Sequence, residues 1–237
     1  MRVYATSVVT AVLAQNTRTV ADVFAVPANV VSAQIGAVLD DMPVAAVKTG
    51  VFPTAEAAAA VAARARAGGL PNLVVDPVLH PAVGSRMALT AAIERLLPHA
   101  VVATPNRDEA SALLGWQVAT PTDMAGAASQ LASGGPRYVV ITGGDFVTGS
   151  DAVDVVWIDG AVRMLHSPRI ASRNTLGSGG TFAAAIAARL ALGDEPPDAI
   201  AFAKGFVSRA IGDAAEWQLG AGSGPVDHFG WSSLTFR

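Results

Sequence analysis

Short apolar runs alternate with alanine-rich helical stretches along most of this chain, and no other feature limits its possible folds as strongly. Most of the runs are continuously apolar rather than alternating in polarity, as at residues 101–103 and 138–141. Continuous apolar strands are typical of a parallel sheet that is covered on both faces, and helices between successive strands supply that cover. The sequence therefore predicts an α/β fold of three layers, with a mostly parallel central sheet between two layers of helices.

Turn and capping residues divide the chain into its elements. Thr54 is a favourable N-cap for a helix that Gly68-Gly69 ends, and Asp159-Gly160 favours a hairpin. Strands are expected at residues 3–13, 45–51, 73–77, 101–103, 138–141, 153–158 and 161–165, the first of them buried. Helices are expected at residues 30–39, 54–67, 88–97, 104–114, 123–133, 181–192 and 198–215. Because no linker or internal repeat interrupts this series, we expect a single domain over residues 1–237.

The composition suits a large hydrophobic core, since 51% of the 237 residues are hydrophobic and 15% are charged. The net charge of −3 and the lack of basic runs argue against a nucleic-acid partner. No signal peptide opens the chain, and no apolar run of about 18 residues predicts a membrane span. We therefore expect a cytoplasmic protein without a membrane partner. The absence of cysteine excludes disulfides, zinc–thiolate sites and cysteine nucleophiles.

Residues 174–192 combine a glycine-rich turn with an apolar helix. Gly177, Gly179 and Gly180 can adopt backbone angles that side chains forbid, so the turn can aim several N–H groups in one direction. The helix adds its unpaired first-turn N–H groups and the positive end of its dipole. The stretch is either an anion cradle, most simply for a phosphate, or a tight loop that leads into a buried helix.

Polar residues follow several of the predicted strands. Ligands of open α/β sheets bind beyond the carboxyl ends of the strands. The residues that we place at such ends are Gln15, Asp76, Asn106, Glu109 and Gly143-Gly144. The four histidines are scattered without metal-ligand spacing, and no Gly-x-Ser-x-Gly follows a strand. Neither a transition-metal site nor a serine hydrolase is therefore indicated.

Six short motifs occur here in the order that they have in hydroxymethylpyrimidine/phosphomethylpyrimidine kinases, and the chain resembles that family over nearly its whole length. The motifs lie at residues 10–17, 47–50, 75–78, 104–110, 174–179 and 224–229. The resemblance implies a ribokinase-like fold and a homodimer. It also implies transfer of the γ-phosphoryl group of ATP to the pyrimidine precursor of thiamine, first onto a hydroxymethyl group and then onto a phosphate.

The resemblance also implies roles for matching residues. Asp76 and Glu109 match the carboxylates that hold Mg²⁺, partly through water, and oxygen ligands suit this ion. An anion hole is implied at Gly177, Ser178 and Gly179. The positions that match pyrimidine-binding residues are Gln15, Val51 and Val78, and those that match ATP- or phosphate-binding residues are Asn106, Thr142, Gly144 and Thr175. From the residues alone, Gln15 is also compatible with a capped strand end, although binding is the favoured interpretation, and Glu109 is compatible with a first-turn acid that complements the helix dipole.

The chain departs from the family pattern in four places. The family begins with a further strand, a glycine-rich loop and a helix that this sequence lacks. Gly180 occupies the catalytic position, which is cysteine in this family and aspartate in other ribokinase relatives; glycine supplies no general base. Thr142 replaces a phosphate-facing lysine. The segment at residues 79–86 is also unusual, and its His80 or Arg86 is a candidate to supply the lost positive charge.

Two hypotheses follow from these motifs and departures. One is a pyrimidine kinase that uses ATP and Mg²⁺, slowed by the absence of a side chain at Gly180. The other is a non-catalytic relative that still binds a nucleotide, a pyrimidine or a partner subunit.

Overall fold

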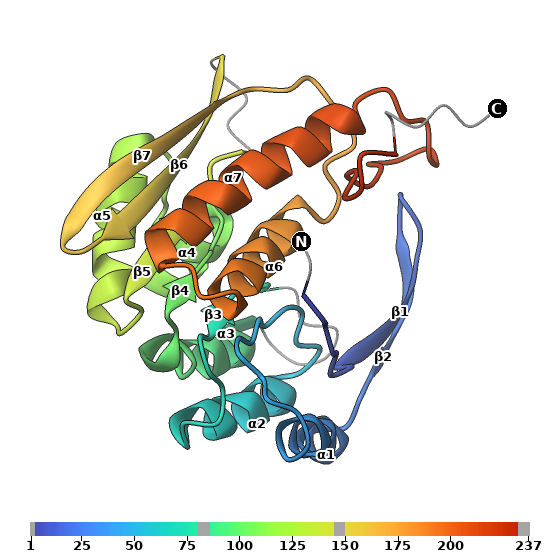
Figure 1. The fold of residues 1–237 in the computed structure, drawn as a ribbon, viewed down its shortest axis with the longest axis vertical. Helices are drawn as coiled ribbons and strands as arrows, with labels where there is room; N and C mark the ends of the chain where they lie inside the picture. Colours follow the sequence, from blue (N-terminus) through green and yellow to red (C-terminus); the bar gives the residue numbers. More distant parts are fainter. Residues whose placement is uncertain (1–2, 80–85, 145–149, 232–237) are drawn as a thin grey trace.

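A five-stranded sheet separates two layers of helices in the computed structural model, which describes residues 3–79, 86–144 and 150–231 (Figure 1). The strands lie in the order β3-β4-β5-β6-β7. Their bounds are β3 Val74–Val75, β4 Val102–Ala103, β5 Tyr138–Ile141, β6 Asp151–Ile158 and β7 Ala161–Pro168. β3, β4 and β5 are parallel, whereas β6 pairs antiparallel with both β5 and β7. A parallel bridge from Lys48 to Val74 extends the parallel side of the sheet.

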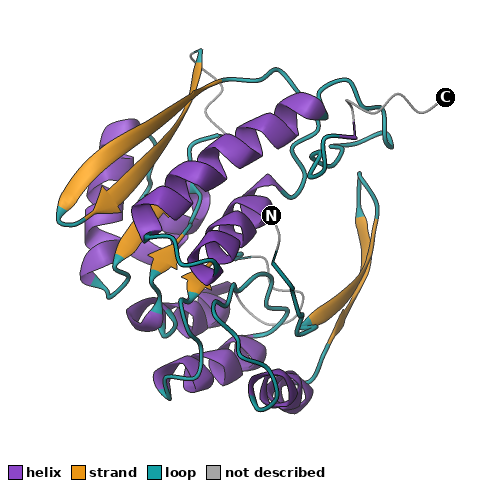
Figure 2. Ribbon diagram, in the orientation of Figure 1, coloured by secondary structure: helices purple, strands orange, loops and turns teal. Residues whose placement is uncertain are grey.

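Each strand of the parallel part contributes side chains to both faces of the sheet. Val75, Ala103 and Val139 belong to one buried cluster, while their neighbours Val74 and Val102 belong to the other. Successive side chains of a strand point to opposite faces, so a continuous apolar run buries both faces at once. This is the physical basis of the predicted α/β/α arrangement, and Figure 2 shows the short parallel strands in the middle of the molecule between helices.

The two helical layers differ in size. The helices of the larger layer are α1 Ala28–Leu39, α2 Ala55–Arg66, α3 Arg86–Glu94, the 3₁₀ turn η1 Leu97–His99, α4 Arg107–Leu114 and α5 Pro121–Ser133. The smaller layer consists of α6 Ser178–Ala191 and α7 Pro196–Asp213. The predicted N-cap of α2 is confirmed, because Thr54 Oγ1 accepts a hydrogen bond from Ala57 N at 3.2 Å. In the described ranges no helix is long and apolar enough to cross a membrane.

The prediction of a buried first strand at residues 3–13 was wrong. Strand β1 (Ala11–Gln15) instead pairs antiparallel with β2 (Val20–Ala25) in a separate two-stranded sheet. Both strands are largely exposed to solvent. Between them, Asn16 Oδ1 accepts hydrogen bonds from the N–H groups of Arg18 and Thr19. This local turn, which asparagine favours, reverses the chain and was overlooked in the sequence.

Both ends of this hairpin are tied to the main body. Near its base, Thr10 Oγ1 donates a hydrogen bond to Val51 O at 2.7 Å. At its tip, Thr17 Oγ1 accepts one from Gly222 N at 3.1 Å. Figure 1 accordingly draws the hairpin (blue) with its tip close to the loop that follows α7 (red). The hairpin therefore spans from the end of the 47–51 segment to the C-terminal loop.

Candidate active site

The carboxyl ends of β3, β4 and β5 bring three polar segments to one edge of the sheet. Because these strands are parallel and adjacent, Asp76, Asn106 and Thr142 all follow strands at the same edge. Asn106 and Thr142 form a parallel bridge, and Thr142 N donates to Pro105 O at 3.0 Å. The predicted clustering at the strand ends is therefore present for Asp76 and Asn106, and Thr142 joins them.

Asn106 and Glu109 form a capping box at the start of α4. Asn106 Oδ1 accepts from Glu109 N, and Glu109 Oε2 accepts from Asn106 N, both at 2.8 Å. Glu109 is only 6% exposed. Burial raises its pKa to about 7, and the nearby carboxylates of Asp76 and Asp108 add to the rise, while the Asn106 N–H and Arg86 oppose it. Glu109 is thus more than a surface acid at a helix dipole: the cap holds its carboxylate inside the site.

Asp76 supplies a second buried carboxylate beside Glu109. It is 6% exposed, its N–H donates to Thr49 Oγ1 at 3.2 Å, and its Oδ2 lies 3.2 Å from Lys48 Nζ. Burial raises the pKa of Asp76, and the Lys48 ammonium opposes this rise. The second oxygen of each carboxylate has no hydrogen-bond partner within the described ranges.

This donor set is compatible with Mg²⁺. Two buried carboxylates that repel one another have spare oxygen atoms, and Mg²⁺ prefers oxygen ligands. Among the described residues no group of three or more His, Cys, Asp or Glu side chains is placed to hold a metal. A cation at Asp76 and Glu109 would therefore complete its shell with water and phosphate oxygens, as Mg²⁺ commonly does.

The glycine-rich turn places its N–H groups at the start of α6. Gly177 is the N-cap with φ +83°, and no side chain caps the helix. Ser178 N donates to Thr175 O, and Thr181 N donates to Gly177 O. For the N–H groups of Gly179 and Gly180, the described chain contains no acceptor. Because both residues are at least partly exposed, the turn is open to a ligand rather than sealed in the interior.

The turn before α6 is held by buried hydrogen bonds. Asn174 is fully buried, and its Nδ2 donates to Ala214 O at 2.6 Å and to Trp217 O at 2.9 Å. Leu176 N donates to Gly224 O, which joins two of the motifs that are 50 residues apart in sequence. These contacts fix the direction in which the N–H groups of the turn point.

Lys48 connects the cradle with the carboxylates, and the sequence reasoning assigned it no role. A Cβ atom built on Gly180 would lie 3.6 Å from Lys48 Nζ, and this nitrogen is 3.2 Å from Asp76 Oδ2. In the sequence, Lys48 stands out as the one charged residue in an otherwise uncharged run at residues 42–55, and this pattern could have identified it as a candidate site residue.

The residues expected to bind the pyrimidine lie on separate segments of the chain. Gln15 was placed at a strand end of the central sheet, and that placement was wrong, because Gln15 lies on the exposed hairpin. Val51 is exposed and lies beside the base of the hairpin through its contact with Thr10. Val78 is half-buried, and its N–H donates to Asp76 O. Val51 and Val78 thus lie within a few residues of Lys48 and Asp76.

The remaining expected residues lie on separate segments of the chain. Gly144 follows Thr142, and its carbonyl accepts a hydrogen bond from Arg169 Nη1 at 3.1 Å. Thr175 is exposed at the turn before α6. Arg86 begins α3, whereas His80 lies outside the described residues.

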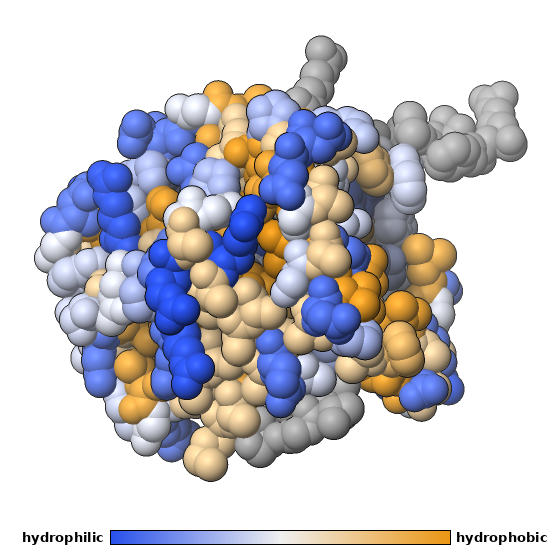
Figure 3. All heavy atoms as spheres, turned by 90° about the horizontal axis from the view of Figure 1, so that it is seen from below, coloured by the Kyte–Doolittle hydropathy of each residue, from blue (hydrophilic) through white to orange (hydrophobic). Residues whose placement is uncertain are grey.

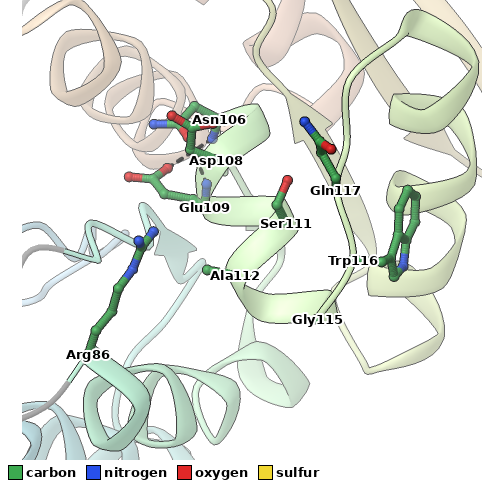
Figure 4. Close-up of a pocket in the computed structure, with 9 residues that line it drawn as sticks. All are labelled: Arg86, Asn106, Asp108, Glu109, Ser111, Ala112, Gly115, Trp116 and Gln117. Carbon is green, nitrogen blue, oxygen red and sulfur yellow. Dashed lines mark hydrogen bonds between the residues drawn. The ribbon is translucent and has the colours of Figure 1, made fainter.

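A cavity of about 630 Å³ opens beside Glu109 and was not predicted (Figure 4). Arg86, Asn106 and Glu109 line one end of it, and Ser111 and Trp116 line the other. Figure 4 shows the Arg86 side chain extending from α3 toward Glu109. The cavity places a cation opposite the capping-box carboxylate.

Solved structures with this architecture are ribokinase-like kinases. The structure is similar to a pyridoxal kinase from Bacillus subtilis, with a TM-score of 0.87 and 34% identity over 95% of this chain and 86% of the other. It is also similar to a phosphomethylpyrimidine kinase from Clostridium difficile 630, with a TM-score of 0.73 and 28% identity over 89% and 87% of the two chains. The fold is therefore that of the ribokinase-like class of small-molecule kinases.

Sequence relatives identify the family within this class. Residues 1–227 match the family model of phosphomethylpyrimidine kinase. The hydroxymethylpyrimidine/phosphomethylpyrimidine kinase of Streptomyces coelicolor is 43% identical over 95% of this chain and 83% of its own length. The chloroplastic thiamine biosynthetic bifunctional enzyme of Arabidopsis thaliana is 42% identical over 96% of this chain, which spans 45% of that longer protein. The chain belongs to the phosphomethylpyrimidine kinase family.

Proposed function

We propose that this chain transfers the γ-phosphoryl group of ATP to hydroxymethylpyrimidine and then to hydroxymethylpyrimidine phosphate, the substrates named for its Streptomyces relative. One observation carries the proposal. Asp76, whose buried carboxylate lies near that of Glu109, forms an ion pair with Lys48, and Lys48 Nζ in turn lies near Gly180 at the open start of α6. A phosphoryl group in transfer needs both a cation site and a set of donors for its oxygens.

Mg²⁺ and ATP occupy the strand ends in this proposal. Asp76 and Glu109 would hold Mg²⁺, partly through water, and the ion would supply positive charge opposite the ATP phosphates. Asn106, Thr142, Gly144 and Thr175 line the phosphates and the nucleotide. Thr142 offers a hydroxyl rather than a positive charge.

The turn before α6 acts as the anion hole. The N–H groups of Gly179 and Gly180 donate to the oxygens of the transferred group, where charge accumulates in the transition state. Gly180 itself supplies no group to remove the proton of the substrate hydroxyl. Phosphoryl transfer depends mainly on positioning and charge, so the reaction proceeds in this chain at a reduced rate.

The pyrimidine lies between the hairpin and the end of β3 in this proposal. The amide of Gln15 can both donate to and accept from a heteroaromatic ring, and the hairpin that carries it is anchored at Val51. Val51 and Val78 then supply apolar contacts to the ring.

The chain is a cytoplasmic homodimer in this proposal. On the hairpin, Val12 is 58% and Phe24 66% exposed. Viewed from below, hydrophobic surface gathers on the side where Figure 1 draws the hairpin (Figure 3). Covering this surface with a second copy would remove apolar area from water. Sedimentation velocity of the wild type and of a Phe24→Glu variant tests the dimer, and an unchanged monomer for both would refute it.

Direct product analysis tests the proposed activity. Purified protein is incubated with ATP, Mg²⁺ and hydroxymethylpyrimidine, hydroxymethylpyrimidine phosphate or pyridoxal, and the phosphorylated products are measured by mass spectrometry. We expect both pyrimidine products and their loss in an Asp76→Asn variant. Phosphorylation of pyridoxal alone would refute the substrate assignment. Nucleotide binding without any product would favour the non-catalytic hypothesis.

A further inference from the structure

The chain contains two lysines, and each forms an ion pair with a buried aspartate. Lys204 Nζ lies 2.8 Å from Asp154 Oδ2 and also donates to Ala152 O at 3.1 Å. Lys48 Nζ has a single acceptor in the described part of the chain, Asp76 Oδ2 at 3.2 Å. An ammonium group has three N–H donors. Two donors of Lys48 are therefore available to a ligand.

Three segments of the chain meet at this ammonium group. Besides Asp76 at the end of β3, Cβ atoms built on Gly50 and Gly180 would lie 3.3 Å and 3.6 Å from Lys48 Nζ. Both of these residues are glycine, so neither places a side chain beside the ammonium group. Lys48 Nζ consequently faces the first turn of α6 directly.

The other cation at the site, Arg86, acts on the other carboxylate. Arg86 interacts with Glu109 from the start of α3, whereas Lys48 contacts Asp76 and adjoins Gly180. Each carboxylate of the Asp76–Glu109 pair therefore has its own cation. Of the two cations, Lys48 is the one that lies near Gly180, in the turn that carries the open N–H groups of Gly179 and Gly180.

We infer that Lys48 is a catalytic residue whose ammonium group contacts the phosphoryl group in transfer, an inference that rests on the proposed kinase reaction. Its N–H groups and those of Gly179 and Gly180 form one donor set around the oxygens of that group. Charged donors bind phosphoryl oxygens more strongly than neutral ones, and such donors act on charge that develops in the transition state. The contact requires no proton transfer to or from Lys48.

Removal of the charge should lower the turnover number. We expect Lys48→Met to reduce kcat about 10²- to 10³-fold, the typical effect of losing one transition-state donor. KM for ATP should change less than about threefold, because the contact matters most when the phosphoryl group is in transit. Lys204→Met is the matched control, since it removes the other partly buried lysine from its own ion pair.

Chemical restoration of the charge at position 48 distinguishes a catalytic role of Lys48 from a structural one. Because the native chain has no cysteine, Lys48→Cys carries a unique thiol. Alkylation of this thiol with 2-bromoethylamine recreates an ammonium group of nearly the same length, while iodoacetamide gives a neutral side chain. We expect the amine to restore at least about a tenth of wild-type kcat and the amide to restore none. Equal rescue by both reagents, or full activity of Lys48→Met, would overturn the inference.

A binding measurement tests the role of Lys48 independently of the proposed pyrimidine substrates. Calorimetry compares ADP·Mg²⁺ with ADP·Mg²⁺ plus aluminium fluoride, which mimics a phosphoryl group in transfer. We expect Lys48→Met to weaken the aluminium fluoride complex at least about tenfold and ADP alone less than about threefold. This pattern would support the role of Lys48 even if the wild type phosphorylated no pyrimidine. Equal affinities of wild type and Lys48→Met for the aluminium fluoride complex would overturn it.

Discussion

Replacing Gly180 by cysteine should raise the rate of the proposed phosphoryl transfer. The substitution is sterically possible, because a Cβ atom at this position meets only Lys48 Nζ at 3.6 Å, an ordinary van der Waals distance. Gly180 is also not among the residues with positive φ. A cysteine has a higher helix propensity than glycine. We therefore expect no loss of folding stability.

The expected gain follows from the chemistry of the new thiol. A nearby ammonium group and a helix N-terminus both favour the thiolate, and Lys48 and the first turn of α6 supply both. A positioned general base typically contributes about 10²- to 10⁴-fold to a rate. We predict that kcat for hydroxymethylpyrimidine increases by at least about tenfold, with KM for ATP nearly unchanged.

The assay measures ADP release in the presence of ATP, Mg²⁺ and hydroxymethylpyrimidine. Gly180→Ala is the control, because it adds the same Cβ atom without a titratable group. Iodoacetamide should abolish the gain in Gly180→Cys and leave the cysteine-free wild type unaffected. If Gly180→Cys and Gly180→Ala have the same kcat as the wild type, position 180 does not face the substrate hydroxyl.

Three further substitutions test separate parts of the structure. The pKa of Glu109 rises from its usual 4.5 to about 7, so the folded state holds this proton more tightly than the unfolded state. Its ionisation should therefore cost stability between pH 4.5 and 7, by up to about 3 kcal/mol. In urea unfolding without Mg²⁺, this loss should disappear in Glu109→Gln; an equal pH dependence of both proteins would contradict it. Asn174→Ala leaves the carbonyls of Ala214 and Trp217 without their buried donor, and we expect a loss of about 2–4 kcal/mol in the same assay; a loss below about 0.5 kcal/mol would contradict this role. Thr142→Lys should lower KM for ATP several-fold by adding a charge near the phosphates, and an unchanged KM would place Thr142 away from them.

The central layers of this fold were predictable because parallel, doubly covered strands leave a simple pattern. The run Tyr138–Ile141 is apolar at every position, so it needs cover on both faces wherever it lies. The hairpin was not predictable by the same rule. Its valines and phenylalanine resemble those of a buried strand, although Val12 and Phe24 are exposed, and burial depends on which neighbour covers a strand.

The parts of the site that follow from the order of the strands in the sheet were predictable from the sequence. Asp76 and Asn106 follow adjacent parallel strands, so their position at one edge follows from topology. The capping box of Asn106 and Glu109 was also readable from their spacing. The meeting of Lys48 with Gly180 was not, because these residues lie 132 positions apart and meet only through the packing of α6 against the sheet.

Binding of a non-hydrolysable ATP analogue with Mg²⁺ tests most directly whether the turn before α6 receives the terminal phosphate. Gly179 is suited to this test, because a Cβ atom there meets no other group within 4 Å. Gly179→Asp introduces a negative charge into the proposed cradle, and Gly179→Asn introduces a neutral side chain of the same shape. The structure predicts that calorimetry will show binding to the wild type, a loss of at least about 30-fold for Gly179→Asp, and a much smaller loss for Gly179→Asn. Equal affinities of the two variants would contradict a phosphate at this position.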